Sequence, residues 1–272
     1  MDNPGHGPTL YPCGMVGKPK NCGPVHACAR SERMDRRRRI DRRFGCLSSH
    51  PMIDALVIGA SGGIGRAVAE EMKARGGNVT TLSRTQDGLD VTDPASVERV
   101  MGSLTGPFQT VFISVGILAP DGAAPEKQLS AIDPATMARV FAVNTIGVAH
   151  LMTHLPRLLP KRGRSVTGVL TARVGSIGDN KMGGWYSYRA SKAALNQIVH
   201  GAAVELGRSH RDAIVSALHP GTVDTDFTAG YDPKHGKSSP AQAASDLCDV
   251  MERLMPEQSG GFFDYSGAEI PW

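Results

Sequence analysis

The sequence predicts an α/β fold: a doubly wound parallel sheet in a single domain, flanked by helices on both faces. Three observations lead to this. From Met52 onward, short apolar runs typical of strands alternate with longer stretches typical of helices. The strand-like runs are apolar throughout, as expected for strands buried on both faces of a parallel sheet. Residues 1–51 show neither pattern, so we expect a disordered extension over 1–51 and a domain over 52–272.

The expected elements follow in strict alternation along the chain. Strands are predicted over 55–58, 78–82, 110–114, 166–171 and 214–218, with a last one at 262–265. Helices are predicted over 64–75, 94–102, 134–155, 187–207 and 240–254. One connection is irregular, because only five residues separate Arg84 from Asp90, whereas a parallel crossover needs about a dozen. We therefore expect no helix there, and any third strand near 89–91 would follow an abbreviated link.

The N-terminal segment differs from the domain in charge. Residues 1–51 contain ten Lys/Arg and four Asp/Glu, a net charge of +6, while the remainder carries −2. Four of the five cysteines, Cys13, Cys22, Cys28 and Cys46, lie there without Cys-x-x-Cys spacing, which argues against a zinc site and leaves no predicted metal site. A wrongly chosen start upstream of Met52 and an arginine-rich nucleic-acid arm are the other interpretations.

Composition excludes several classes of protein. The domain lacks the basic surface of a nucleic-acid binder, no apolar run approaches the roughly 18 residues that span a membrane, and a signal peptide is not evident. With a single cysteine in the domain, no disulfide framework is expected. We therefore expect a cytoplasmic protein that does not bind nucleic acid or membranes.

A glycine-rich turn joins the first strand to the first helix. Gly59, Gly63 and Gly65 carry no side chain, so the backbone can approach a pyrophosphate at the N-terminus of the helix. Ser61 and Ile64 belong to the same turn. Its spacing differs from G-x-G-x-x-G, and no Gly-Lys-Ser/Thr of a P-loop follows. The turn predicts a dinucleotide site in a Rossmann-type fold.

The end of the second strand indicates which dinucleotide binds. An acidic residue there would repel a 2′-phosphate, but this chain has Ser83 and Arg84, and a guanidinium suits a phosphate. We therefore predict NADP(H), with NAD(H) possible and a solvated Arg84 as the alternative. Asp90 and Val91 are expected to contact the adenine of the cofactor. Ser114, Val115 and Gly116, at the end of the predicted strand 110–114, are expected to line its path.

Tyr188 and Lys192 are the candidate catalytic pair. Their spacing of four places both on one face of the predicted helix 187–207. A lysine charge beside a phenol favours the phenolate, so we expect the pair to lower the pKa of Tyr188 and to exchange protons near neutral pH. A phosphate-binding turn and a proton donor are the two features that a carbonyl reductase needs.

The glycine turn, Asp90-Val91, Ser114-Val115-Gly116, Asn144, Tyr188-x-x-x-Lys192 and Pro220-Gly221 together resemble the short-chain dehydrogenase/reductase family over residues 53–272. The segments 173–177 and 184–192 resemble its C-factor and sniffer-type carbonyl reductase branch. The resemblance implies that Tyr188 protonates a carbonyl oxygen, that Lys192 binds the nicotinamide ribose, and that Asn144 holds a water. It also implies nicotinamide contacts from Pro220, Gly221, Val223 and Thr225, and a homodimer or homotetramer.

The chain departs from this family where a serine normally orients the substrate carbonyl. Alignment along the strand places Ala172 there, while counting back twelve residues from Tyr188 gives Ser176. We take Ser176 as the candidate and Thr171 as the second. The departure also keeps an alternative open, a non-catalytic NADP-binding sensor or signalling protein of the same fold. The primary prediction is an NADP-dependent reductase acting on a small-molecule carbonyl or alcohol.

Overall fold

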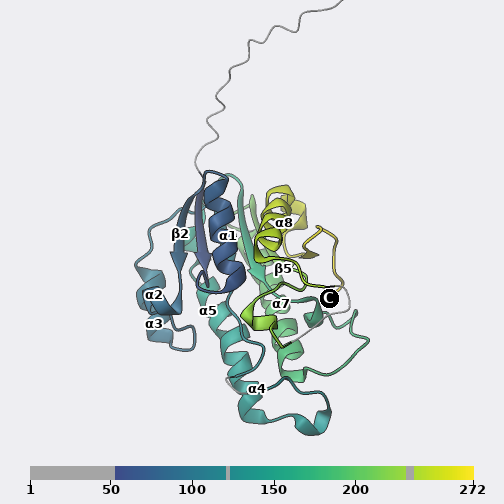
Figure 1. Cartoon of the computed structure of the whole chain (residues 1–272). Coiled ribbons are helices and arrows are strands. Elements are labelled where there is room, and N and C mark those ends of the chain that lie inside the picture. Colours follow the sequence, from purple (N-terminus) through teal and green to yellow (C-terminus); the bar gives the residue numbers. More distant parts are fainter. Residues whose placement is uncertain (1–52, 121–122, 231–235) are drawn as a thin grey trace, which may run out of the picture. The chain divides into compact units, whose positions relative to one another are not determined.

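Six parallel strands form one sheet in the order β2-β1-β3-β4-β5-β6 (Figure 1). This computed structural model describes residues 53–120, 123–230 and 236–272. The strands are β1 Asp54–Ile58, β2 Asn78–Leu82, β3 Thr110–Ile113, β4 Ser165–Leu170, β5 Ala213–His219 and β6 Phe262–Asp264. The doubly wound parallel sheet is thereby confirmed. Our predictions for residues 1–51 lie outside the described residues.

Helices cover both faces of the sheet (Figure 1). Helices α1 and α8 share one core with one face of the sheet, and α3, α5 and α7 share a second core with the other face. The α-helices are α1 Gly63–Ala74, α2 Arg84–Asp87, α3 Pro94–Gly102, α4 Pro134–Phe141, α5 Val148–Met152, α6 Leu155–Leu158, α7 Tyr186–Leu206 and α8 Pro240–Arg253. The shorter turns are η1 Leu129–Ala131, the π-helical η2 Ala142–Gly147, η3 Arg173–Gly175, η4 Asp226–Thr228 and η5 Pro256–Gln258.

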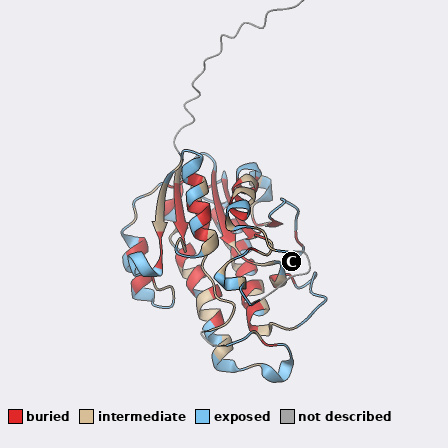
Figure 2. Ribbon diagram, viewed as in Figure 1, coloured by how far each residue is buried: buried red, intermediate tan, exposed pale blue. Residues whose placement is uncertain are grey.

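The central strands are mainly apolar because they have a core on each side. In β1, Leu56 and Ile58 belong to the core under α3, α5 and α7, while Ala55 and Val57 belong to the core under α1 and α8. All four are almost fully buried, and the interior strands are red in Figure 2. The apolar runs in the sequence therefore reflect burial on both faces, as predicted.

The possible third strand near residues 89–91 is absent, because the described chain forms no strand there. After β2, where we expected no helix, the chain makes the single turn of α2, whose N-cap is Ser83 and which ends at Gly88 with φ +64°. The Asp90 carboxylate then accepts hydrogen bonds from Thr92, and Asp93 caps the start of α3. The backbone therefore turns straight into α3, and β2 remains at the edge of the sheet.

The predicted helix 134–155 is continuous from Pro134 to Met152, with π-helical turns in its middle. Within the described residues this stretch, unlike our expectation from the sequence, is long and apolar enough to cross a membrane by length and composition alone. Its buried residues Val140, Val148 and Leu151 are part of the protein interior. This packing accounts for part of the apolar composition, since 39% of the stretch is buried.

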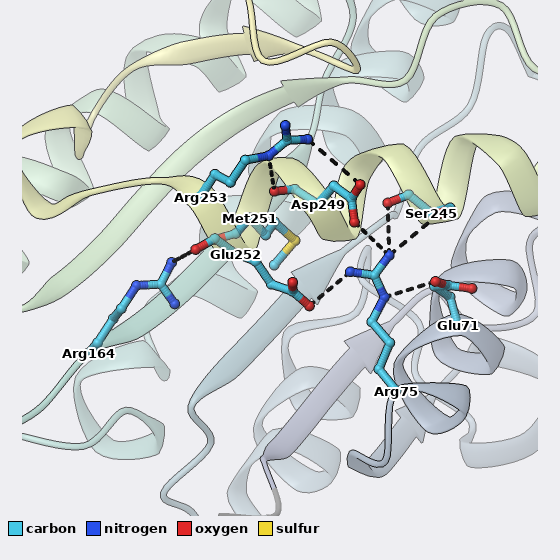
Figure 3. Close-up of polar contacts among 8 residues, drawn as sticks. All are labelled: Glu71, Arg75, Arg164, Ser245, Asp249, Met251, Glu252 and Arg253. Atoms are coloured by element: carbon cyan, nitrogen blue, oxygen red, sulfur yellow. Dashed lines mark hydrogen bonds and ion pairs between the residues drawn. The ribbon is translucent and has the colours of Figure 1, made fainter. Parts of the chain in front are cut away.

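Helix α8 is held to α1 by a polar cluster centred on Arg75 (Figure 3). Its guanidinium makes ion pairs with Glu71 at 2.8 Å, Asp249 at 2.8 Å and Glu252 at 2.9 Å. Nearby, one terminal nitrogen of Arg164 donates to three carbonyl oxygens at the end of α8. These contacts fasten the last helix to the first, on the face of the sheet that carries the glycine turn.

Candidate active site

The predicted site residues meet at the carboxyl edge of the sheet. The glycine turn follows β1, Ser114–Gly116 follow β3, and Pro220–Thr225 follow β5. From β1 the sheet continues to β2 on one side and to β3 on the other, so the chain reverses direction of winding at this point. Ligands of open α/β sheets bind in the crevice outside such a reversal.

The glycine turn is packed too closely for side chains. A Cβ on Gly65 would lie 2.3 Å from the Gly59 carbonyl oxygen, and one on Gly63 would lie 2.6 Å from Thr225. Gly59 has φ +91°, a conformation that favours glycine. The N-cap of α1 is Gly62, which makes no side-chain capping bond. The first amides of a twelve-residue helix are therefore left for an anion at the turn that also holds Ser61 and Ile64.

The residues beyond β2 lie beside this turn. Leu82 at the end of β2 accepts hydrogen bonds from Gly59 and from Ala60. Ser83 is buried and caps α2, while its amide donates to Asp87 at 2.7 Å. Arg84 is exposed, and its charge contributes, after the hydrogen bonds from Thr92, to holding the pKa of Asp90 below its usual range. A guanidinium and a carboxylate thus stand at the outer end of the crevice.

Gly116, Asn144 and Lys192 converge on one point. A Cβ on Gly116 would lie 3.3 Å from both Asn144 Oδ1 and Lys192 Nζ. Asn144, in the π-helical turns, accepts from the Ile117 amide at 2.7 Å and donates to the Ile117 carbonyl at 2.8 Å. It also donates to Ser191 Oγ at 3.0 Å. The asparagine therefore joins the loop after β3 to the helix that carries Lys192.

Tyr188 and Lys192 are both buried on the same face of α7. The Lys192 ammonium lies 5.9 Å from the centroid of the Tyr188 ring and donates to the Leu170 carbonyl at 3.1 Å. Burial raises the pKa of Tyr188 well above its usual value and lowers the pKa of Lys192 to about 8. Our expectation of a lowered phenol pKa is therefore wrong for this arrangement, because loss of solvent around the phenol outweighs the lysine charge.

The start of α7 is held by a residue that the sequence analysis missed. Gly183, Gly184 and Trp185 have φ of 64°, 67° and 52°, and Trp185 is the non-glycine residue among them. The buried Glu126 fixes this turn, since its carbonyl accepts from the Trp185 amide and its carboxylate accepts from the amide and hydroxyl of Ser187. A lone acidic residue in a loop gives no sequence signal for this positioning role.

The loop after β5 closes the other side of the site. Gly221 has φ +77° and packs against the Tyr265 ring, Val223 pairs with Ser238, and Thr225 contacts Gly63. The Phe227 ring stands 5.9 Å from the Tyr188 ring. A cavity of about 250 Å³ opens beside it. Its lining is Gly116, Ile117, Leu118, Ala119, Ala123, Pro125, Asp226 and Phe227.

The sequence also predicts that the substrate pocket is walled by the segment around Met182 and Trp185 and by the loop 222–239, which carries Phe227 and Tyr231. Trp185 lies 6.2 Å from the Tyr188 ring, centroid to centroid, and so borders the site. Met182 is 87% exposed, so its side chain is not packed in a pocket wall. Tyr231 lies outside the described residues. Pro220, predicted beside the cofactor, directly follows β5 at the same sheet edge.

The hydroxyls proposed to replace the missing serine have other partners. Ser176 donates to the Pro271 carbonyl near the C-terminus and accepts from the Asp179 amide. Thr171 donates to Asn196 Oδ1 at 2.7 Å. Ala172, directly after Thr171, offers no hydroxyl. Either residue as carbonyl donor stays a prediction that these contacts do not support.

The imidazole of His219 lies at the end of β5, directly before the loop. Burial is the main cause that lowers the pKa of His219 to about 4, and the nearby Arg173 adds to it, while Asp264 opposes it. Arg173 and Asp264 form an ion pair of 3.2 Å. The buried His219 Nδ1 has no hydrogen-bond partner within the described parts of the chain. His219 is thus neutral at pH 7.

Comparison with known proteins agrees with this geometry. Residues 54–236 match the family model described as short chain dehydrogenase, so the chain belongs to the short-chain dehydrogenase/reductase family and is one of its oxidoreductases. Two curated relatives are similar. The 1-hydroxy-2-glutathionyl-2-methyl-3-butene dehydrogenase of Rhodococcus sp. (strain AD45) is 31% identical, over 81% of this chain and all of the relative. The C-signal of Myxococcus xanthus is 39% identical, over 53% of this chain and 83% of the relative.

Solved structures share the fold. A short-chain dehydrogenase/reductase from Burkholderia multivorans with bound NADP superposes with a TM-score of 0.70 at 24% identity, covering 82% of this chain and 100% of that one. Carbonyl reductase Sniffer of D. melanogaster superposes with a TM-score of 0.66 at 20% identity, covering 81% and 100%. The predicted family is confirmed by the family model, a curated relative named C-signal is similar to the chain, and the solved structures confirm the fold.

Proposed function

We propose that this chain reduces a ketone or aldehyde with NADPH and that Tyr188 supplies the proton. The observation that carries the proposal is that Lys192 lies beside the Tyr188 ring and meets Asn144 at Gly116, in the loop after β3. The dehydrogenase name of the Rhodococcus relative is consistent with oxidoreductase chemistry.

The residues present fit a dinucleotide. The tight packing of Gly59, Gly63 and Gly65 leaves their backbone accessible where side chains would fill the turn. Arg84 places a positive charge beyond β2, which favours a 2′-phosphate, and the Burkholderia structure was solved with NADP. Asp87 already rests on the Ser83 amide, so the phosphate would rely on Arg84 rather than on that amide. When bound, the cofactor supplies the hydride.

Side chains of this protein donate the proton and stabilise the charge that remains. With its pKa raised by burial, the Tyr188 phenol keeps its proton at neutral pH and can give it to a carbonyl oxygen that gains charge. Lys192, whose pKa is lowered to about 8, stands close enough to stabilise the phenolate that remains. Asn144 holds the loop after β3 against α7 and thereby keeps Gly116 in contact with the pair. These roles suit reduction, in which the enzyme starts with a protonated tyrosine.

The cavity beside Phe227 suits an apolar carbonyl compound of modest size. Its described lining is mainly aliphatic, with Asp226 as the one acidic residue. A carboxylate in the wall disfavours an anionic substrate. The exposed Phe227 ring and its contact with Tyr188 place an aromatic surface next to the proposed proton donor.

We also propose a homodimer or homotetramer in the cytoplasm, built through the helices that carry Asn144 and Tyr188. Ile146 is 64% exposed and Val204 is 53% exposed, one on each of these helices. Light scattering of the purified chain tests this, and a monomer at micromolar concentration would contradict it.

A second candidate function is NADP-dependent signalling without turnover. It is favoured by Ala172 at the place of the usual serine, by the engaged hydroxyls of Thr171 and Ser176, and by similarity to a protein named C-signal. This version keeps the cofactor site but needs no reaction.

NADPH consumption by the purified chain over a panel of ketones, aldehydes and quinones separates the two functions. Turnover that disappears in Tyr188→Phe supports the reductase. NADPH binding without turnover on any substrate supports the signalling protein instead.

A further inference from the structure

Two histidines and a glutamate meet on the side of the molecule where α3 contacts α5. His150 lies in α5, and His154 follows four residues later at the start of α6. Glu98 lies in α3. Both Nε2 atoms face the same carboxylate oxygen, at 3.0 Å from His150 and 3.5 Å from His154. The sequence analysis missed this cluster, although the spacing His-x-x-x-His on a helix is a signal for it.

The distances match those of a metal site. The three ligand atoms lie within 4.8 Å of one another. Ligands about 2.0–2.1 Å from a tetrahedral zinc ion stand about 3.3 Å apart, so small side-chain rotations bring all three to a common ion. Two imidazoles and one carboxylate are ligands that zinc accepts, with water in the fourth position.

The surroundings of His154 also suit a cation. The His154 side chain is only 10% exposed, and its Nε2 is buried without a hydrogen bond in the described structure. A neutral imidazole with a free nitrogen lone pair is the form that binds a metal. A buried nitrogen that makes no hydrogen bond costs stability, and a metal ion would satisfy it better than the 3.5 Å contact with Glu98 does.

We propose that Glu98, His150 and His154 form a binding site for a divalent transition-metal ion, with zinc as its occupant. The ion would clamp α3 to the helix that runs from α4 to α5. Glu98 is exposed and His150 half-buried, so the ion can enter from solvent without opening the core.

The position of this clamp is close to the cofactor crevice. Helix α3 starts directly after the segment Asp90–Thr92, and Gly147 on the clamped helix packs against Val91, where a Cβ would come within 2.7 Å. Asn144 precedes His150 by six residues on the same continuous helix. The clamp therefore holds together two segments that border the crevice, and its existence does not depend on the proposed reaction.

Cobalt titration of the full-length, metal-free chain tests the site. The four N-terminal cysteines are first alkylated in the native state, which spares the buried Cys248. We expect one Co²⁺ per chain with visible ligand-field bands and no near-ultraviolet thiolate band, displaced by Zn²⁺. Glu98→Gln and His150→Gln should each weaken binding by about tenfold or more. Glu70→Gln, an exposed glutamate on α1, and His200→Gln are the matched controls and should bind as the parent does.

A second measurement uses thermal unfolding of the same proteins. Zn²⁺ should raise the melting temperature of the parent and of both control variants in a concentration-dependent way, and should not do so for Glu98→Gln or His150→Gln. Unchanged cobalt affinity in His150→Gln, or an equal zinc shift in all variants, would overturn the proposal. A bare surface hydrogen bond between His150 and Glu98 would be the remaining explanation.

Discussion

The buried charge of Lys192 lowers the free energy of unfolding, and replacing this one residue should raise it. Burial lowers its pKa from 10.5 to about 8, and 1.36 kcal/mol per pKa unit makes the buried charge cost about 3 kcal/mol at neutral pH. Methionine at this position keeps much of the aliphatic chain but carries no charge. Its loss of the hydrogen bond to the Leu170 carbonyl costs about 1 kcal/mol. We therefore predict that Lys192→Met is about 2 kcal/mol more stable than the parent at pH 7.

The difference in stability between the parent and Lys192→Met should change with pH in a defined direction. The folded chain releases the Lys192 proton near pH 8, whereas the unfolded chain keeps it until about pH 10.5. Between these values the unfolded state binds more protons, so the stability of the parent rises with pH. The advantage of Lys192→Met should therefore shrink above pH 8, vanish at about pH 9.5 and reverse to about 1 kcal/mol in favour of the parent by about pH 10.5, because the lost hydrogen bond to Leu170 remains.

Urea unfolding followed by circular dichroism at pH 7, 8.5 and 10 measures the difference between the two proteins. Lys161→Met, at an exposed lysine in a surface turn, is the matched control and should change stability by less than about 0.5 kcal/mol at every pH. A Lys192→Met protein less stable than the parent at pH 7, or a difference that does not vary with pH, would refute the reasoning.

Three further predictions concern the edge of the site. Ala172→Ser should raise kcat by about a hundredfold, because a preorganised hydrogen-bond donor to the substrate carbonyl increases the rate by about that factor. Ser176→Ala should change kcat little, because the Ser176 hydroxyl is bonded to Pro271. Steady-state kinetics measure both variants, and a large loss of kcat in Ser176→Ala would identify Ser176 as the donor. Arg84→Ala should raise KM for NADPH by about tenfold or more while leaving KM for NADH nearly unchanged, and equal effects on both cofactors would remove the phosphate contact. The pKa of His219, lowered to about 4, means that stability is lost as pH falls from 6.5 to 4, by about 3 kcal/mol. His219→Gln should flatten that slope in acid urea titrations, and an unchanged slope would place the effect elsewhere.

The sequence was sufficient for the parts of this protein that follow from periodicity and fixed spacing. Apolar runs such as 55–58 predicted the sheet because strands buried on both faces are mainly apolar, although β4 and β5 also bury Thr167 and Ser216. The spacing of Tyr188 and Lys192 placed them on one face of α7, as the structure shows. The glycines of the first turn were recognisable because a Cβ at Gly65 would overlap the backbone.

The rest depends on contacts between residues distant in sequence. The pKa of Tyr188 moved opposite to expectation because burial in the folded protein, not its neighbour four residues away, dominates. Glu126 reaches the start of α7 from 61 positions away, which no local pattern records. The Ser176 hydroxyl is taken by Pro271, 95 residues further on. Near 89–91, side-chain hydrogen bonds at Asp90 and the cap at Asp93 replaced the strand that the short apolar run allowed.

The central claim is that Tyr188 protonates a carbonyl substrate during reduction with NADPH. The most direct measurement is NADPH consumption at pH 7 by the full chain and by Tyr188→Phe over one substrate panel, with NADPH binding measured by fluorescence for both proteins. The account predicts that both bind NADPH and that only the parent turns over. Equal turnover by the two proteins, or binding without turnover in the parent, would contradict it.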